Sequence, residues 1–340
     1  MAKTVLVTGA SGFVASYVVK AFLDAGWNVK GSVRNTQKAQ HLFERYPEHA
    51  DKLSLVEVKD IVTGEGLKEA LQGVDAIAHT ASPYALTYTH PIKDFIDPAV
   101  KGTLSVLKAA KEAGIKRVVV TSSFAAVTNL NAGGPWRDYT YTAADWNPAT
   151  IEDVLKPGCP GPFVYSASKT LAERAAIDYA AENGLIVSTL CPPMVYGAPL
   201  QKVASKNDVN TSSAAIYSLI TGPEDREVPW NRLPLFVNVQ DLALAHVKAL
   251  EISDDVAGQR FLLYGGSFTW EDAIAHLQTA RPALASRLPK LPETFKDAGK
   301  LIAKLDITPA REVLGLKALK GWKETLEETI DALVEIEKQF

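Results

Sequence analysis

The sequence has few cysteines and lacks a long apolar run. Cys159 and Cys191 are its two cysteines, and each stands alone, so the sequence indicates neither a disulfide framework nor a cysteine zinc site. The chain enters a strand-like pattern at once, without a secretory leader, and no apolar stretch has the length of a membrane helix. These absences predict a cytoplasmic protein in a reducing compartment, with no membrane partner.

An excess of charge of one sign is also lacking. The 36 Lys and Arg nearly balance the 39 Asp and Glu, which leaves a net charge of -3, and no block of like charges occurs. Nucleic-acid binding normally needs such a block, so we expect a small-molecule partner and no nucleic acid. The expected oligomeric state is a monomer or a homodimer. Since 47% of the 340 residues are hydrophobic, the chain can build a large core, which excludes an intrinsically disordered protein.

Short apolar runs alternate with longer helical patterns through the first half of the chain. This alternation is typical of βαβ units, which form a parallel sheet covered by helices. The predicted strands are Thr4 to Val7, Val29 to Val33, Leu53 to Val58, Ala76 to His79, Val118 to Thr121 and Ile186 to Leu190. We therefore predict an α/β fold of the Rossmann type, a doubly wound parallel sheet with a smaller mixed α/β lobe toward the C-terminus.

The domain boundaries are predicted where prolines and polar loops replace this alternation. We assign residues 1–192, together with about 234–265, to the Rossmann domain. Residues 193–233 and 266–340 are assigned to the smaller, substrate-binding lobe.

The first predicted strand runs into a turn of small residues. Gly9, Gly12 and Ala15 have the spacing of a dinucleotide-binding turn, in which the first glycine makes the turn and the second admits the pyrophosphate. The helix that follows offers free N–H groups and a positive dipole end to the phosphates. The residues expected to bind the cofactor here are Gly9, Ser11, Gly12, Phe13 and Val14.

The second predicted strand ends at a cation. NAD-binding proteins usually carry an acidic residue there, which binds the 2′-hydroxyl of the ribose, whereas this chain has Arg34 with Lys38 four residues on. Both cations can hold a 2′-phosphate through charge-assisted hydrogen bonds, so NADPH is the expected cofactor, although two solvated surface cations are the alternative. Asp60 and Ile61 are expected to border the adenine, unless Asp60 only caps a helix.

A second group of residues points to proton transfer. Tyr165 and Lys169 lie one helical turn apart and therefore on one face of a predicted helix. A carbonyl that accepts a hydride needs a proton donor, and a free phenol, with a pKa of about 10, is a poor one near neutrality. The charge of Lys169 lowers this pKa, and its ammonium can bind ribose hydroxyls. Either Ser122 or Ser123, at a strand end, could hold the carbonyl oxygen. A half-buried tyrosine on an amphipathic helix is the alternative.

Several segments together resemble a known family. VTGASGFVAS, SVR with a later lysine, KDI, AHTASP, RVVVTSSFAAV, YSASKTLAE and CPPMVYG resemble the extended short-chain dehydrogenase/reductases, in particular the dihydroflavonol reductases and the fungal methylglyoxal or aldehyde (carbonyl) reductases. The resemblance implies that Ser123 is the catalytic serine, that Tyr165 is the acid, and that Lys169 lowers the pKa of this acid. The further cofactor contacts that it implies are Ala81, Ser82, Pro83, Pro192 and Val195, beside Tyr165 and Lys169.

The expected function is NADPH-dependent reduction of an aldehyde or ketone to an alcohol. Phe124, Trp136 and Tyr139 are candidates for an apolar substrate pocket, with plain packing as the alternative, and no metal site is expected. A nucleotide-sugar epimerase or dehydratase on the same scaffold is a second interpretation, which Arg34 disfavours. A non-catalytic, NADP-sensing regulator is a third, which the intact serine, tyrosine and lysine set disfavours.

Overall fold

A parallel sheet forms the centre of the molecule. The computed structural model describes residues 2–82, 87–223, 225–295, 297 and 299–340. Seven strands in this part of the chain form the sheet: β1 (Thr4–Thr8), β2 (Asn28–Val33), β3 (Leu53–Glu57), β4 (Ala76–His79), β5 (Arg117–Thr121), β7 (Ile186–Cys191) and β10 (Arg260–Leu262). Their order is β3-β2-β1-β4-β5-β7-β10, which is the strand order of a Rossmann fold. The predicted fold class is confirmed.

The burial of the strands follows their place in the sheet. Val5, Leu6 and Val7 of β1 are fully buried, as expected for a central strand that has helices on both faces. In β3, which is an edge strand, Ser54 and Glu57 are exposed instead. The sequence run that encodes β3 is therefore less apolar than those of the central strands.

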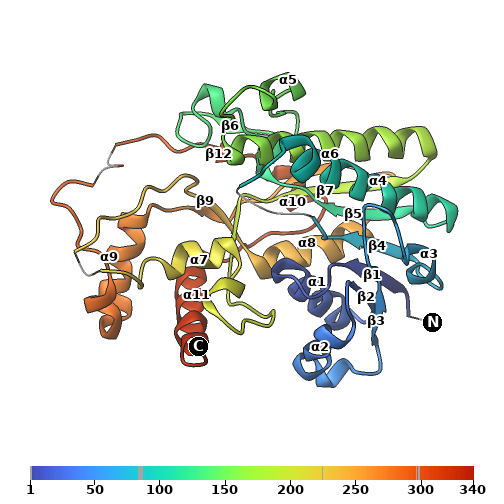
Figure 1. Cartoon of the computed structure of the whole chain (residues 1–340), viewed down its shortest axis with the longest axis horizontal. Coiled ribbons are helices and arrows are strands. Elements are labelled where there is room, and N and C mark those ends of the chain that lie inside the picture. Colours follow the sequence, from blue (N-terminus) through green and yellow to red (C-terminus); the bar gives the residue numbers. More distant parts are fainter. Residues whose placement is uncertain (1, 83–86, 224, 296, 298) are drawn as a thin grey trace.

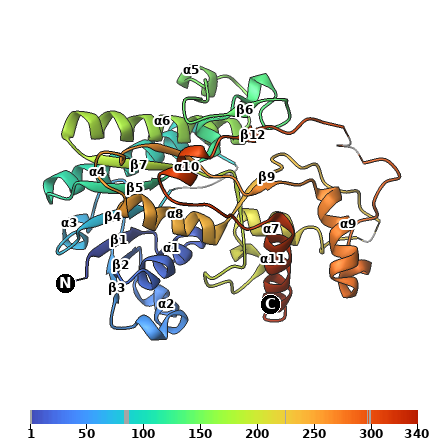
Figure 2. The same ribbon diagram turned by 180° about the vertical axis from the view of Figure 1, so that it is seen from behind.

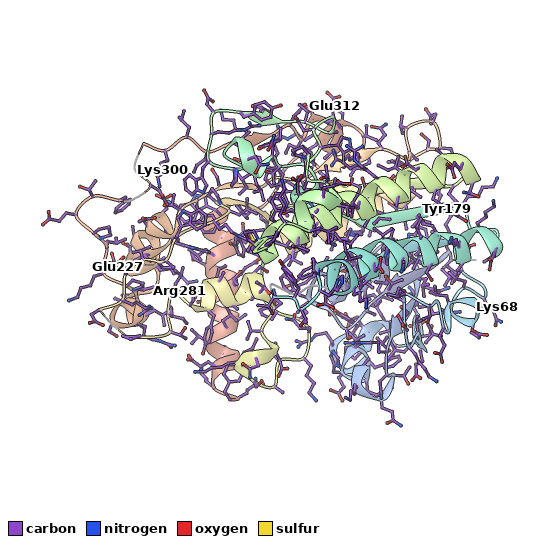
Figure 3. The ribbon with its side chains drawn as sticks, turned by 45° about the horizontal axis from the view of Figure 1, so that its top comes forward. Lys68, Tyr179, Glu227, Arg281, Lys300 and Glu312 are labelled. Atoms are coloured by element: carbon purple, nitrogen blue, oxygen red, sulfur yellow. The ribbon has the colours of Figure 1, made fainter. Side chains whose placement is uncertain are left out.

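Helices cover both faces of the sheet (Figure 1). On one face lie α3 (Leu67–Ala70), α4 (Asp97–Glu112) and α6 (Gly161–Asn183), and Figure 3, which labels Tyr179 of α6, shows α4 and α6 side by side. On the other face lie α1 (Phe13–Asp24), α2 (His41–Arg45), α8 (Val239–Glu251) and α10 (Thr308–Glu312). The sheet is thus the middle layer of three.

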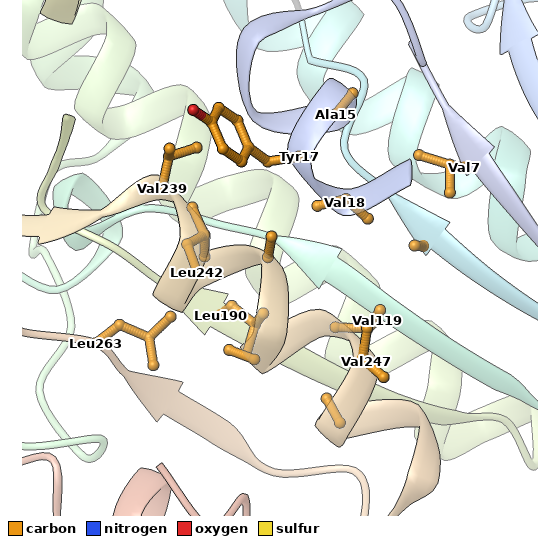
Figure 4. Close-up of a cluster of buried hydrophobic side chains, with 14 of the residues drawn as sticks. Val7, Ala15, Tyr17, Val18, Val119, Leu190, Val239, Leu242, Val247 and Leu263 are labelled. Atoms are coloured by element: carbon orange, nitrogen blue, oxygen red, sulfur yellow. The ribbon is translucent and has the colours of Figure 1, made fainter. Parts of the chain in front are cut away.

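Figure 4 shows the core between α1, α8 and the sheet. Val7 of β1, Val119 of β5 and Leu190 of β7 meet Val18 of α1 and Leu242 of α8, and all five side chains are fully buried. Burying an aliphatic side chain of this size stabilises the fold by about 1.5–3 kcal/mol. This layer therefore fixes β1 and the turn that follows it.

The long helix α6 has clear start and stop signals. Pro162 lies in its first turn, where its missing N–H costs no hydrogen bond, and Gly184 ends the helix in the left-handed conformation, with φ of 68°. These limits place Tyr165 and Lys169 in the first turns of the helix, close to the ends of β5 and β7.

A smaller lobe follows β7 in the sequence (Figure 2). It contains a second sheet of β8 (Met194–Tyr196), β9 (Leu235–Asn238) and β11 (Gly266–Ser267), with α7 (Thr211–Tyr217), α9 (Trp270–Ala280) and α11 (Trp322–Glu337). A further pair, β6 (Thr140–Tyr141) and β12 (Lys304–Leu305), lies with α5 (Ile151–Val154) above α6. Within 234–265, β10 belongs to the large sheet, whereas β9 pairs with β8 and β11.

Candidate active site

A groove of about 1040 Å³ runs along the ends of β1, β2 and β4. Its size is at the upper end of the range of ligand pockets, about 300–1,000 Å³. Most of the residues predicted to bind the cofactor line it: Gly9, Ser11, Gly12, Phe13, Val14, Arg34, Asp60, Ile61, Ala81, Ser82 and Val195. All of these residues except Val195, which lies on β8, belong to the Rossmann part.

The turn after β1 needs its glycines. Gly9 has a φ of 67°, and a Cβ on it would lie 3.1 Å from the Cβ of Ala81 across the groove. The backbone closes tightly, since the N–H of Gly12 donates to the carbonyl of Gly9 at 2.9 Å. Among the described residues, no side chain caps the N-terminus of α1, so its first N–H groups stay available to an anion. The turn therefore fits a pyrophosphate.

The cations lie at the end of the groove that β2 and β3 form. Arg34 is exposed and lines the groove, and Lys38 follows in a turn in which its N–H donates to Oδ1 of Asn35 at 3.1 Å. Lys59, which was not singled out from the sequence, also lines the groove, with its Nζ 3.3 Å from Oε1 of Glu65. In the sequence, Lys59 stands in the KDI segment beside Asp60.

Asp60 has two contacts that bear on its predicted role. It lines the groove, as expected for a residue that borders the adenine. Its Oδ1 also accepts the N–H of Val62 at 2.7 Å, so the carboxylate stabilises a local turn.

Tyr165 and Lys169 lie on one face of α6, as their spacing predicts. Nζ of Lys169 is 5.8 Å from the centroid of the Tyr165 ring and donates a 2.7 Å hydrogen bond to Oγ of Ser82. Lys169 is only 8% exposed, and burial lowers its pKa to about 8, although the negative charge of Glu173 acts in the opposite direction. Because Ser82 lines the groove, this bond places the ammonium at the groove's end.

The two serines after β5 have different surroundings. Ser122 is buried, and its hydroxyl donates to Oε2 of Glu173 at 2.8 Å. Ser123 is partly exposed, and its Oγ accepts the N–H of Ala125 at 3.1 Å. The turn after Ser123 packs against α6, and its Phe124 N–H donates to the carbonyl of Pro192. Ser123 therefore has the more accessible hydroxyl.

The remaining predicted residues are spread more widely. Phe124 is 1% exposed and packs edge-on against Tyr141, which is the packing role named as its alternative. Trp136 donates from Nε1 to the carbonyl of Asn231 in the smaller lobe, and Tyr139, 39% exposed, donates to Asp145. These aromatics lie outside the wall of the groove. Pro83, another predicted cofactor contact, falls outside the described residues.

The smaller lobe supplies a second wall, of which the sequence predicted Val195 alone. Met194, Asn210, Thr211 and Ser212 line the groove together with the glycine turn. Their distance in sequence from that turn hides the contact, which depends on how the loop before α7 folds back.

Other kinds of site find no support in the described part of the chain. No group of three or more His, Cys, Asp or Glu side chains there could hold a metal ion. The helices found in that part also include none with the length and apolar character needed to cross a membrane.

The strand order and the glycine turn define a class, the Rossmann-type dinucleotide-binding proteins. Residues 5–263 match the NAD dependent epimerase/dehydratase family, and the chain belongs to this family. The resemblance to its fungal and plant reductases is thereby confirmed by comparison as well as by motif.

Relatives and solved structures cover nearly the whole chain. The ketoreductase azaE of Aspergillus niger is 36% identical over 93% of both chains. The NADPH-dependent methylglyoxal reductase of Saccharomyces cerevisiae is 30% identical and covers 98% of this chain and 99% of its own. The crystal structure of Gre2 from Candida albicans in complex with NADPH superimposes with a TM-score of 0.87, at 31% identity over 98% of this chain and 99% of that one.

Proposed function

We propose that the chain is an NADPH-dependent carbonyl reductase that converts an aldehyde or ketone to an alcohol. Tyr165 donates the proton, Lys169 lowers the pKa of the phenol, and Ser123 holds the carbonyl oxygen. Ketones and short oxoaldehydes are the proposed substrate classes, because relatives are a ketoreductase and a methylglyoxal reductase.

One contact carries this proposal. The hydrogen bond from Lys169 to Ser82 joins the face of α6 that bears Tyr165 to a residue of the groove wall. The glycine turn after β1 lies between Arg34, after β2, and Ser82, after β4, so a cofactor bound over this turn would reach the face of α6 at the Ser82 end of the groove. Two similar structures were solved in complex with NADPH, which supports NADPH as the cofactor.

The groove fits NADPH on chemical grounds. The turn at Gly9 leaves no room for a side chain, and Arg34 supplies a positive charge at the end of the groove that β2 and β3 form. When bound, NADPH supplies the hydride. The chain's own contribution is to orient the carbonyl through Ser123 and to deliver a proton to its oxygen from Tyr165.

The ammonium of Lys169 makes this proton transfer possible near neutrality. Its positive charge favours the phenolate of Tyr165 and so makes the phenol a stronger acid. Burial keeps the ammonium away from bulk water, so its field on the phenol is screened weakly.

Arg34 separates this function from that of an epimerase on the same scaffold. An arginine at the groove favours a 2′-phosphate, whereas an acidic residue at this place favours NAD. We expect the purified chain to consume NADPH with at least one compound from a panel of ketones, diketones and aldehydes, followed by absorbance. A chain that binds NADPH but reduces none of them would contradict the proposal.

A further inference from the structure

The carboxylate of Glu173 lies directly behind the proposed site. Glu173 is on α6, one turn after Lys169 and two turns after Tyr165, and its side chain is fully buried. A buried carboxylate is tolerated only when it is paired and hydrogen-bonded, because the loss of hydration costs several kcal/mol.

Donors from three strand ends satisfy this carboxylate. Oε2 accepts the hydroxyl of Ser122 at 2.8 Å and Nη2 of Arg260 at 3.2 Å. Oε1 accepts Thr189 Oγ1 at 2.6 Å, Cys191 Sγ at 3.2 Å and Arg260 Nε at 2.9 Å. One group of α6 therefore holds the ends of β5, β7 and β10 together.

Arg260 extends the same network into the segment between Ser123 and α6. Its Nη2 donates to the carbonyl of Ala126 at 3.1 Å, and its Nη1 donates to the carbonyl of Ala143 at 3.0 Å and to that of Asp145. The guanidinium also stacks on Trp146, with Cζ 3.7 Å from the ring centroid. The guanidinium thus anchors the start and the middle of this segment to the sheet.

We propose that Glu173 is a positioning residue for the reduction. Together with Arg260 it fixes Ser123, through the neighbouring Ser122, relative to the catalytic face of α6. Its negative charge also keeps the ammonium of Lys169 protonated. This inference rests on the proposed function.

The electrostatic part of the inference depends on what surrounds Lys169. The groups that face it are Tyr165 and Glu173 on α6, Ser82 after β4, His79 on β4 and Cys191 on β7. Burial lowers the pKa of His79 to about 4 and holds the pKa of the Cys191 thiol well above its usual range, so both are neutral near pH 7. Among the described groups that face Lys169, Glu173 is thus the negative charge that raises the pKa of Lys169, against the lowering caused by burial.

Glu173→Gln in the full chain is the direct test. We expect NADPH affinity, measured by cofactor fluorescence, to change less than about threefold, while kcat at pH 8 falls about tenfold. The alkaline limb of the kcat profile should move to lower pH by about one unit, because Lys169 loses its negative neighbour. A purely structural role would lower stability and leave this limb in place. A folded variant with wild-type kcat and an unmoved limb would overturn the inference.

Ser122→Ala tests the positioning part even if Glu173→Gln does not fold. This substitution leaves the ion pair intact and removes one buried hydroxyl, and we expect kcat to fall about tenfold with unchanged NADPH affinity. Thr329→Val is the matched control, since it removes a buried hydroxyl from α11 in the smaller lobe and should leave kcat unchanged. Equal kcat values in the Ser122 and Thr329 variants would overturn the inference.

A separate variant distinguishes this inference from the proposed function. Ser123→Ala should lose activity if the proposed function is correct. If Ser123→Ala is inactive while Glu173→Gln and Ser122→Ala behave like the wild type, only the inference fails. If Ser123→Ala keeps full activity, Ser123 does not hold the carbonyl oxygen, and it is the proposed function that is contradicted.

Discussion

Lys169 and Ser82 meet across the end of the groove, where the ammonium of a buried lysine donates to a serine hydroxyl at 2.7 Å. The bond connects α6 to the segment after β4, two parts of the chain that are 87 residues apart. A lysine whose pKa burial has lowered to about 8 loses its proton within an accessible pH range. Because Lys169 is proposed to strengthen the phenol of Tyr165 as an acid, we expect the proposed reaction to slow in alkali.

The first prediction concerns this alkaline loss. We expect kcat for carbonyl reduction to fall as the pH rises through about 8, because Lys169 becomes neutral and no longer strengthens the phenol of Tyr165 as an acid. Lys169→Met should lower kcat at pH 7 by about 10²-fold or more and abolish the step near pH 8. A Lys169→Met variant with the same pH step would show that another group titrates.

The second prediction concerns cofactor choice. Arg34→Asp reverses a charge in the groove wall, so it should weaken NADPH binding and shift preference toward NADH by about tenfold or more. Lys38→Ala should shift it less, because Lys38 lies outside that wall. The measurement is kcat/KM with both cofactors. If the wild type and the Arg34 variant prefer NADPH over NADH equally, Arg34 does not bind the 2′-phosphate.

The third prediction concerns the contact beneath the glycine turn. A Cβ on Gly31 of β2 would lie 2.8 Å from the Cβ of Ala10 and 3.1 Å from Cδ2 of Leu55. Gly31→Ala should therefore lower the free energy of unfolding by about 1–3 kcal/mol and weaken NADPH binding, because it displaces the turn. Gly321→Ala, where a Cβ meets nothing within 4 Å, is the control for cofactor binding: it lies at the N-cap of α11 in the smaller lobe, so it should leave NADPH binding unchanged even if it lowers stability slightly. Urea unfolding and cofactor fluorescence measure both effects.

The fourth prediction concerns stability in acid. Burial lowers the pKa of His79 and of His246 to about 4, from 6.5. The unfolded chain therefore binds more protons than the folded one between these values, so this stability is present above pH 6.5 and is lost as the pH falls toward 4. When the pH is lowered from 7 to 5, we expect each of these histidines to lower the free energy of unfolding by about 2 kcal/mol.

His246→Asn should remove about half of this pH dependence. His90→Asn, at an exposed position, is the control and should leave it unchanged. Urea unfolding at pH 7 and pH 5 gives the difference directly. An unfolding free energy that does not fall between these pH values would contradict burial of neutral histidines.

The sheet and the glycine turn were predictable because their signals are local. Each central strand is a short apolar run, and the turn at Gly9 lies within a few residues of β1. The face shared by Tyr165 and Lys169 also follows from helical spacing alone, and the structure confirms it. Such features depend on neighbours in sequence.

The parts that were missed depend on contacts between distant segments. Glu173 pairs with Arg260, 87 residues away, and no periodicity marks two such residues as partners. Asn210 reaches the groove from the smaller lobe, and β9 joins the small sheet, for the same reason. The aromatic Phe124 could equally line a pocket or fill a core until its packing against Tyr141 was known.

The most direct measurement compares Tyr165→Phe with the wild type, in cofactor binding and in a single turnover of carbonyl reduction with NADPH. The account predicts that the variant binds NADPH normally, because the phenyl ring is retained, and that reduction slows by about 10²-fold or more, because the proton donor is gone. A Tyr165→Phe variant that reduces the same carbonyl compound at the wild-type rate would contradict the account.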